Sequence, residues 1–167
     1  MKAKHDLLTL MGRVLFLRKV PLFENVKSEE LKAIAAICQE KGFVKDELIV
    51  KENDIGDSLF IVKQGSVRIT KIVQHSEIVL TTLHPKSYFG EMGIFDNAPR
   101  SANCYADESC VLLTIFKDTF RDVVIQYPEI ALQLFVVFSN RLRESNERIK
   151  ELSELLEKKG VKSVSNN

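Results

Sequence analysis

Between Gly42 and Phe116 the sequence repeats short runs of β-branched and apolar residues, separated by turn signals. The runs read LIV, SLFIV, SVRITKIV, EIVLTTL and CVLLTIF, and the turn signals read NDIGD, KQGS, QHSE, HPKS and DNAP. Runs of this length are typical of strands, and no long helical pattern separates them, so a parallel α/β sheet does not fit. The spacing predicts an antiparallel β-roll or jelly roll.

Helical periodicity precedes the strand-forming region. The apolar residues that repeat at this spacing are Leu7, Met11, Val14 and Leu15. They predict an amphipathic helix over about residues 4–18, which Pro21 ends. Ser28 is the predicted N-cap of a second helix, because its hydroxyl can accept a backbone N–H and two acidic residues follow it.

Helical periodicity returns after Phe116. Residues 117–126 form one predicted segment, and a longer one runs from 128 to 158 with Pro128 in its first turn. The whole chain is therefore predicted to be mainly β with flanking α-helices: a roll with N-terminal helices and a long C-terminal helix. The expected segments are 1–20 (amphipathic helix), 21–127 (β-roll with its flanking helices), 128–159 (long helix) and 160–167 (flexible tail).

The charge and the apolar runs exclude several classes of protein. The 24 basic and 23 acidic residues nearly cancel, so no overall field attracts nucleic acid or an anionic membrane. No apolar run reaches the roughly 18–20 residues of a membrane span. We expect a cytoplasmic protein that binds neither nucleic acid nor membrane.

The histidines and cysteines do not form a metal or catalytic set. The three cysteines lack CxxC spacing and fit a reduced core, and the three histidines lack the paired spacing of a metal-binding jelly roll. No nucleophile–base pair is apparent. The expectation is no metal, no catalytic residue and no enzyme activity.

The stretch SYFGEMGIFDNAPRSANCYA, residues 87–106, carries the chemistry. Gly90 and Gly93 allow close approach to a short helical turn near Glu91, and Arg100 can bind two phosphate oxygens with its planar fork. Glu91 would repel phosphate but can accept a hydrogen bond from a ribose hydroxyl. These residues together describe a site for a nucleotide that has both a phosphate and a 2′-OH.

The same residues resemble the phosphate-binding cassette of the cyclic nucleotide-binding domain family. The cassette reads FGEMGI at residues 89–94 and RSA at 100–102, and NDIGDSLFIVKQGSVRI at 53–69 is similar to a second block of that family. The resemblance covers about residues 20–150. It implies cAMP or cGMP as the ligand, with no other cofactor.

The resemblance also implies a role for each site residue. Arg100 and Ser101 would bind the cyclic phosphate, Glu91 the ribose 2′-OH, and a polar pair on the long helix the base. The implied ligand-binding positions are Phe89, Gly90, Glu91, Met92, Gly93, Arg100, Ser101, Ala102, Ser145 and Asn146. Gly56 and Gly65 are expected to form turns, and Ser145 and Asn146 could equally be solvated helix positions.

A heptad pattern on the long helix indicates a second surface. Its apolar positions are Phe135, Leu142, Ile149 and Leu156, with Phe138 and Leu152 between them. The pattern predicts a parallel homodimer, as the resemblance to bacterial cAMP receptors implies, although Ser145 interrupts it. Otherwise the first half of the helix packs on the roll and the rest stays amphipathic.

The sequence thus predicts a stand-alone regulatory protein that binds a cyclic nucleotide, cAMP more than cGMP, and signals through its C-terminal helices to an unidentified effector. A DNA-binding domain would require some 50–60 further residues, and none is expected here. The alternative is a protein–protein interaction and dimerisation module with a vestigial nucleotide pocket.

Overall fold

The computed structural model describes residues 2–96 and 98–158, with side chains from residue 8 onward. The predicted tail at 160–167 and the side chain of Leu7 lie outside this part. The helical elements are α1 (Lys2–Leu17), η1 (Pro21–Phe23), α2 (Ser28–Ile37), α3 (Met92–Phe95), α4 (Lys117–Gln126) and α5 (Glu129–Lys158). The strands are β1 (Gln39–Phe43), β2 (Leu48–Val50), β3 (Ser58–Gln64), β4 (Val67–Val73), β5 (Ser76–Leu83), β6 (Tyr88–Phe89), β7 (Asn103–Ala106) and β8 (Cys110–Phe116).

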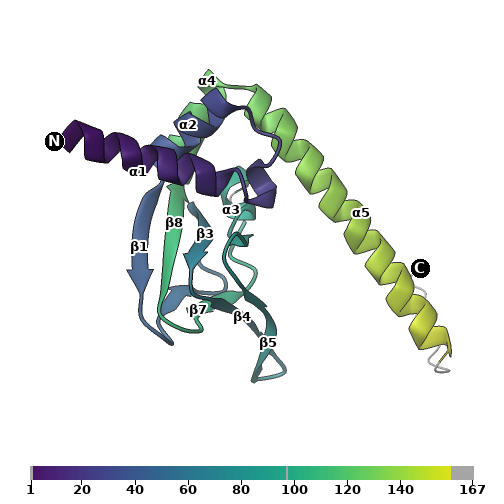
Figure 1. Ribbon diagram of the computed structural model, residues 1–167. Helices are drawn as coiled ribbons and strands as arrows, with labels where there is room; N and C mark the ends of the chain where they lie inside the picture. Colours follow the sequence, from purple (N-terminus) through teal and green to yellow (C-terminus); the bar gives the residue numbers. More distant parts are fainter. Residues whose placement is uncertain (1, 97, 159–167) are drawn as a thin grey trace.

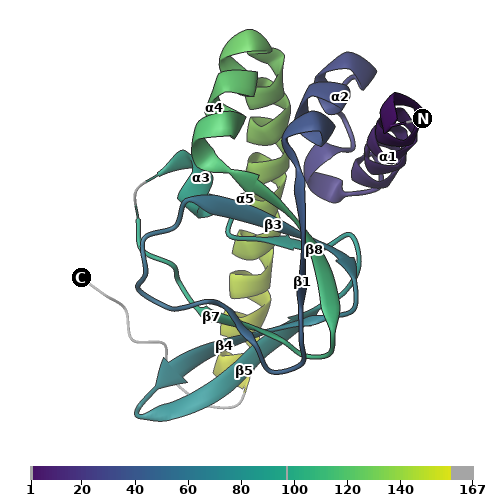
Figure 2. The ribbon, with the colours of Figure 1, turned by 90° about the vertical axis from the view of Figure 1, so that its left-hand side faces the viewer.

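The described strands form two four-stranded antiparallel sheets, ordered β1-β8-β3-β6 and β2-β7-β4-β5. The helices α1, α2 and α4 gather at one end of these strands, and α5 leads away from α4 past the roll (Figures 1 and 2). The predicted antiparallel β-roll with flanking helices is confirmed. Turn chemistry contributes to it, since Gln74 and His75 join β4 to β5 with φ angles of 49° and 66°, as a two-residue type I′ hairpin requires.

The central strand β3 explains how the apolar runs are used. Its residues Ser58–Val62 are all buried, so both of its faces are covered. One face packs on the helices, and the other faces the second sheet. This is why residues 59–62 are all apolar, whereas a strand with one face in solvent would alternate apolar and polar residues.

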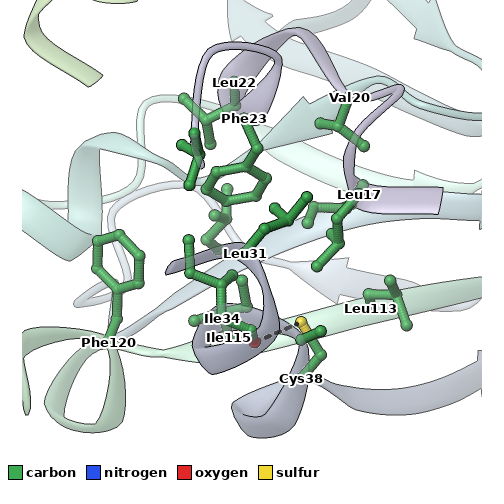
Figure 3. Close-up of a cluster of buried hydrophobic side chains, with 14 of the residues drawn as sticks. Leu17, Val20, Leu22, Phe23, Leu31, Ile34, Cys38, Leu113, Ile115 and Phe120 are labelled. Atoms are coloured by element: carbon green, nitrogen blue, oxygen red, sulfur yellow. Dashed lines mark hydrogen bonds between the residues drawn. The ribbon is translucent and has the colours of Figure 1, made fainter. Parts of the chain in front are cut away.

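Two hydrophobic clusters result from this arrangement. The first joins the helices to the outer faces of β3 and β8, with Phe23, Leu31 and Phe120 fully or almost fully buried (Figure 3). The second lies between the two sheets and includes Phe60 and Phe89, whose rings stack with centroids 5.1 Å apart. This second cluster forms the base of the candidate site.

The start of α2 differs from the prediction. Ser28 is the first helical residue and not the N-cap, which is Lys27. The Lys27 backbone N–H donates to the Glu30 carboxylate at 2.9 Å, so a side chain in the first turn of the helix supplies the capping acceptor. The Ser28 hydroxyl instead accepts a hydrogen bond from Arg18 at 2.9 Å.

The long helix α5 has two different halves. Ile130 and Leu134 are buried against the first cluster, whereas every residue from Asn140 to Lys158 is exposed. The first half thus anchors the helix, and the second half carries its apolar residues into solvent.

Within the described residues, no single helix is long and apolar enough to cross a membrane. The pair α4 and α5 meets that length and composition test only when joined, and it bends by 114° at the break.

Candidate functional site

The turn between β6 and α3 brings the backbone close to Arg100. Gly90 has a φ of 76°, a left-handed conformation that glycine adopts without strain. A Cβ atom at this position would lie 2.5 Å from Nη1 of Arg100. Glycine is therefore required here for both its conformation and its size, and Glu91 follows as the N-cap of α3.

Arg100 is buried with only 9% of its surface exposed. Its Nη1 donates to the Gly90 carbonyl at 3.0 Å and its Nη2 to the Ser58 carbonyl at 2.8 Å. A guanidinium has five N–H donors, so these two bonds leave others for a ligand.

The charge on Arg100 is not balanced by a direct ion pair with any residue that the structure describes. Burial lowers the pKa of Arg100, and Asp57 foremost among the nearby groups opposes that shift. None of the ion pairs formed by the described residues includes Arg100. Arginine stays protonated in proteins, and a buried charge is costly unless it is paired. The site therefore holds a fixed cation suited to an incoming anion.

A cavity of about 210 Å³ lies beside this cation. All eight cassette positions predicted from the sequence line it, namely Phe89, Gly90, Glu91, Met92, Gly93, Arg100, Ser101 and Ala102. Its other walls are mostly apolar and include Val50, Ile69 and Cys104. A few polar groups among mostly apolar walls suit a ligand with an anionic group and a flat organic body.

A larger cavity of about 540 Å³ lies between the segment around Pro21 and α5. Its charged lining is mixed: Lys19, Lys86 and Arg141 face Glu24 and Glu144. We favour the smaller cavity because Arg100 lines it, and this buried cation forms no ion pair with the described residues.

Glu91 has a protein partner that the sequence did not reveal. Its Oε1 accepts a hydrogen bond from Nη1 of Arg141 at 2.8 Å, and 17% of the Glu91 side chain is exposed. The Arg141 guanidinium also lies 4.6 Å from the centre of the Tyr88 ring. Arg141 precedes Ser145 by one helical turn and so shares its face of α5, which was the signal available in the sequence.

The predicted base-binding pair is not brought to the cavity. Ser145 and Asn146 are exposed on the second half of α5, and neither belongs to the cavity lining. Their role at the base stays a prediction.

The three cysteines are free and buried, as expected of core residues. Burial raises the pKa of the Cys104 thiol to about 12. Cys104 therefore stays neutral and acts as a small wall residue next to Arg100.

Comparisons with known proteins match the part of the chain that contains the cassette. Residues 40–127 match the sequence model of the family described as "Cyclic nucleotide-binding domain". The cyclic AMP receptor protein of Thermus thermophilus is 30% identical over 127 residues, which cover 75% of this chain and 59% of that protein. Isozyme 1 of the cGMP-dependent protein kinase of Drosophila melanogaster is 36% identical over 113 residues, 65% of this chain and 15% of that kinase.

Solved structures give the same match in three dimensions. The catabolite activator protein of Thermus thermophilus superposes with a TM-score of 0.71 and 30% identity, covering 80% of this chain and 63% of that one. The regulatory domain of Toxoplasma gondii PKA, crystallised with cAMP, has a TM-score of 0.65 and 28% identity over 68% of this chain and 44% of that one. The chain spans 59% and 61% of the length of two bacterial relatives that it matches.

Proposed function

The chain belongs to the cyclic nucleotide-binding domain family, and from this premise we propose that it is a regulatory protein that binds a cyclic nucleotide beside Arg100. The observation that supports this most is the buried guanidinium, which is bonded to the backbone carbonyls of Gly90 and Ser58 and lies next to a cavity lined by the cassette. A cyclic phosphate would supply the missing negative charge. The two flat N–H edges of arginine match two phosphate oxygens, which strengthens the interaction.

The ribose would lie towards Glu91. A carboxylate can only accept hydrogen bonds, so it pairs with the 2′-OH and not with the phosphate. Glu91 is paired with Arg141, and a ribose hydroxyl would share or replace that bond. The hydroxyl of Ser101 at the cavity wall would donate to the phosphate.

We propose cAMP as the preferred ligand. The relatives include proteins named for cAMP and for cGMP, so the family alone leaves the base open. The reason for cAMP is the polar pair Ser145 and Asn146, which would reach the adenine if α5 folds towards the cavity.

Binding would be passed on through aromatic contacts of the cassette helix. Phe95 on α3 lies edge-on to Phe120 of α4, at 6.1 Å between centroids, and to Phe138 of α5, at 5.4 Å. A shift of α3 when phosphate binds would therefore move both C-terminal helices. The protein would act through this movement and not through catalysis.

The recipient of that movement would be a second copy of the chain. The heptad residues Phe135, Leu142, Ile149 and Leu156 are 72%, 63%, 59% and 48% exposed. Exposed apolar side chains at this spacing pair readily with the same stripe of another helix. A change in the geometry of that homodimer is the proposed output, which an effector protein would read.

The proposal is tested with a panel of nucleotides. Thermal unfolding is measured with cAMP, cGMP and 5′-AMP, the last of which keeps the base and ribose but opens the phosphate ring. A bound ligand at 100 times its Kd adds about 2.7 kcal/mol of stability. We expect cAMP to raise the unfolding temperature most and 5′-AMP least. An unchanged temperature with all three would reject the proposal and favour an interaction module with a vestigial pocket.

A further inference from the structure

Gly56 lies against the side chain of Arg100 although it is not one of the cassette residues. A Cβ atom at Gly56 would lie 2.7 Å from both Cζ and Nε of Arg100 and 3.0 Å from its Cδ. Real Cβ atoms do not approach other atoms this closely. Its φ is not among the positive values, so space and not backbone conformation requires glycine here.

The loop around Gly56 also fixes the backbone of Arg100. The Asn53 backbone N–H donates to the Arg100 carbonyl at 2.9 Å, and the Arg100 backbone N–H donates to the Asp54 carbonyl at 2.8 Å. Ile55 and Pro99 form an isolated antiparallel bridge beside these bonds. The segment 53–55 thus sets where the arginine side chain begins.

The same loop fixes the other end of the side chain. The carbonyl of Ser58 accepts a hydrogen bond from Nη2 of Arg100 at 2.8 Å. Gly56 lies between these two attachments, where the guanidinium and its stem pass over the loop. A side chain at Gly56 would push the guanidinium away from Ser58 while leaving its charge unchanged.

Gly56 differs in this respect from the two cassette glycines that also contact Arg100. Gly90 needs its positive φ, so a substitution there strains the backbone as well. At Gly93 a Cβ would first meet the Gly56 carbonyl at 3.0 Å. Gly56 is the position from which the guanidinium can be displaced with little other change.

We propose that Gly56 is a positioning residue for Arg100, and that the loop from Asn53 to Ser58 holds the guanidinium at the place where the cyclic phosphate binds. This inference rests on the proposed function for its consequence in binding. It replaces the expectation that Gly56 only forms a turn. A turn former would affect folding, whereas a positioning residue affects the phosphate contact through Arg100.

The test combines Gly56→Ala with Arg100→Ala and uses Gly42→Ala as the matched control, since a Cβ at Gly42 meets only a carbonyl oxygen at 4.0 Å. Calorimetry with cAMP should show a loss of about tenfold or more for Gly56→Ala, as expected when a charge-assisted hydrogen bond is lost. Gly42→Ala should bind like the wild type. Adding Gly56→Ala to Arg100→Ala should change neither affinity nor unfolding temperature further, because the obstructing guanidinium is gone.

Several results would overturn the inference. Wild-type affinity in Gly56→Ala, together with weak binding in Arg100→Ala, would show that Gly56 does not position the arginine. If the losses of cAMP affinity in the two single variants add up in the double variant, the substitution at Gly56 acts independently of Arg100. If Gly56→Ala does not fold, folding of the double variant supports the inference, and its failure to fold contradicts it.

A readout without nucleotide separates this inference from the proposed function. The Nε–H signal of Arg100 in ¹H–¹⁵N spectra of the ligand-free protein should shift in Gly56→Ala and stay in place in Gly42→Ala. If Arg100→Ala binds cAMP like the wild type, the proposed function is wrong, and the spectra still decide the positioning role. An unshifted signal in Gly56→Ala would contradict that role.

Discussion

The two ends of the proposed ligand site are built in different ways. Arg100, at the phosphate end, is buried in the roll and forms hydrogen bonds with the loop at 53–58 and with the Gly90 carbonyl. Ser145 and Asn146, at the base end, are exposed on the second half of α5. Arg100 is bonded to the roll, whereas Ser145 and Asn146 would reach the base only if α5 moves.

This difference assigns separate tasks to the two ends. A group that is already fixed loses little further freedom on binding, so it supplies affinity efficiently. A group on a mobile or distant element forms its contact only together with a conformational change, and so couples binding to that change. We therefore expect affinity to depend mainly on the roll and the response mainly on α5.

The largest effect is expected from Arg100→Ala. Removing one partner of a buried charge contact costs about 2–5 kcal/mol, or roughly 30-fold to several thousand-fold in affinity. Arg100→Lys keeps the charge but not the planar fork, so its affinity for cAMP should lie between those of Arg100→Ala and the wild type. Calorimetry with cAMP measures both. Equal affinity in all three proteins would remove the distinction between the two ends.

The second effect concerns the exposed stripe of α5. Leu142→Ala removes an apolar side chain whose burial in a dimer would contribute about 1.5–3 kcal/mol per copy. Sedimentation equilibrium should show a weaker dimer, while Lys150→Ala at a position outside the stripe should leave it unchanged. If the wild-type protein is monomeric at all concentrations, the apolar stripe of α5 does not form a homodimer.

The third effect concerns Glu91. Glu91→Gln should weaken cAMP binding by about tenfold to a hundredfold, as expected for a hydrogen bond to a charged group. The variant should prefer cAMP over 2′-deoxy-cAMP less than the wild type does, because the neutral amide oxygen accepts a weaker hydrogen bond from the hydroxyl than the carboxylate does. Its stability without ligand should fall by less than about 1 kcal/mol, since the Arg141 partner is nearly half exposed. A preserved preference for cAMP over its deoxy form would place the ribose elsewhere.

The smallest effect is expected from Ser145→Ala and Asn146→Ala. If α5 folds over the base as proposed, each substitution removes one neutral hydrogen bond to the adenine and should weaken cAMP binding by about threefold to tenfold in calorimetry. Such a loss would sharpen the comparison, because it would show a contact made only in the bound state. Unchanged affinity in both variants would show that the pair does not reach the base.

Much of the roll and the cassette could be predicted because the signals are local. The β-branched runs and their turn residues mark the strands, and the eight cassette residues follow one another along two short segments that meet at one cavity. A hydrogen bond or a steric contact between distant segments leaves no such pattern.

The contacts that the sequence did not reveal are of that second kind. Arg141 meets Glu91 from 50 residues away, and the Ser58 carbonyl holds Arg100 across 42 residues. Gly56 was predicted to form a turn because the sequence does not show that the Arg100 side chain, 44 residues further along the chain, packs against it. At Ser28 the prediction was wrong, because Lys27 is the N-cap of α2 and its backbone N–H donates to the Glu30 carboxylate.

The most direct measurement is a crystal structure of the full chain grown with cAMP. The account predicts electron density for the cyclic phosphate in the cavity next to α3, with a phosphate oxygen about 2.7–2.9 Å from a guanidinium nitrogen of Arg100. Density for the nucleotide at another place, with the cavity empty and Arg100 bonded only to the carbonyls of Gly90 and Ser58, would contradict it.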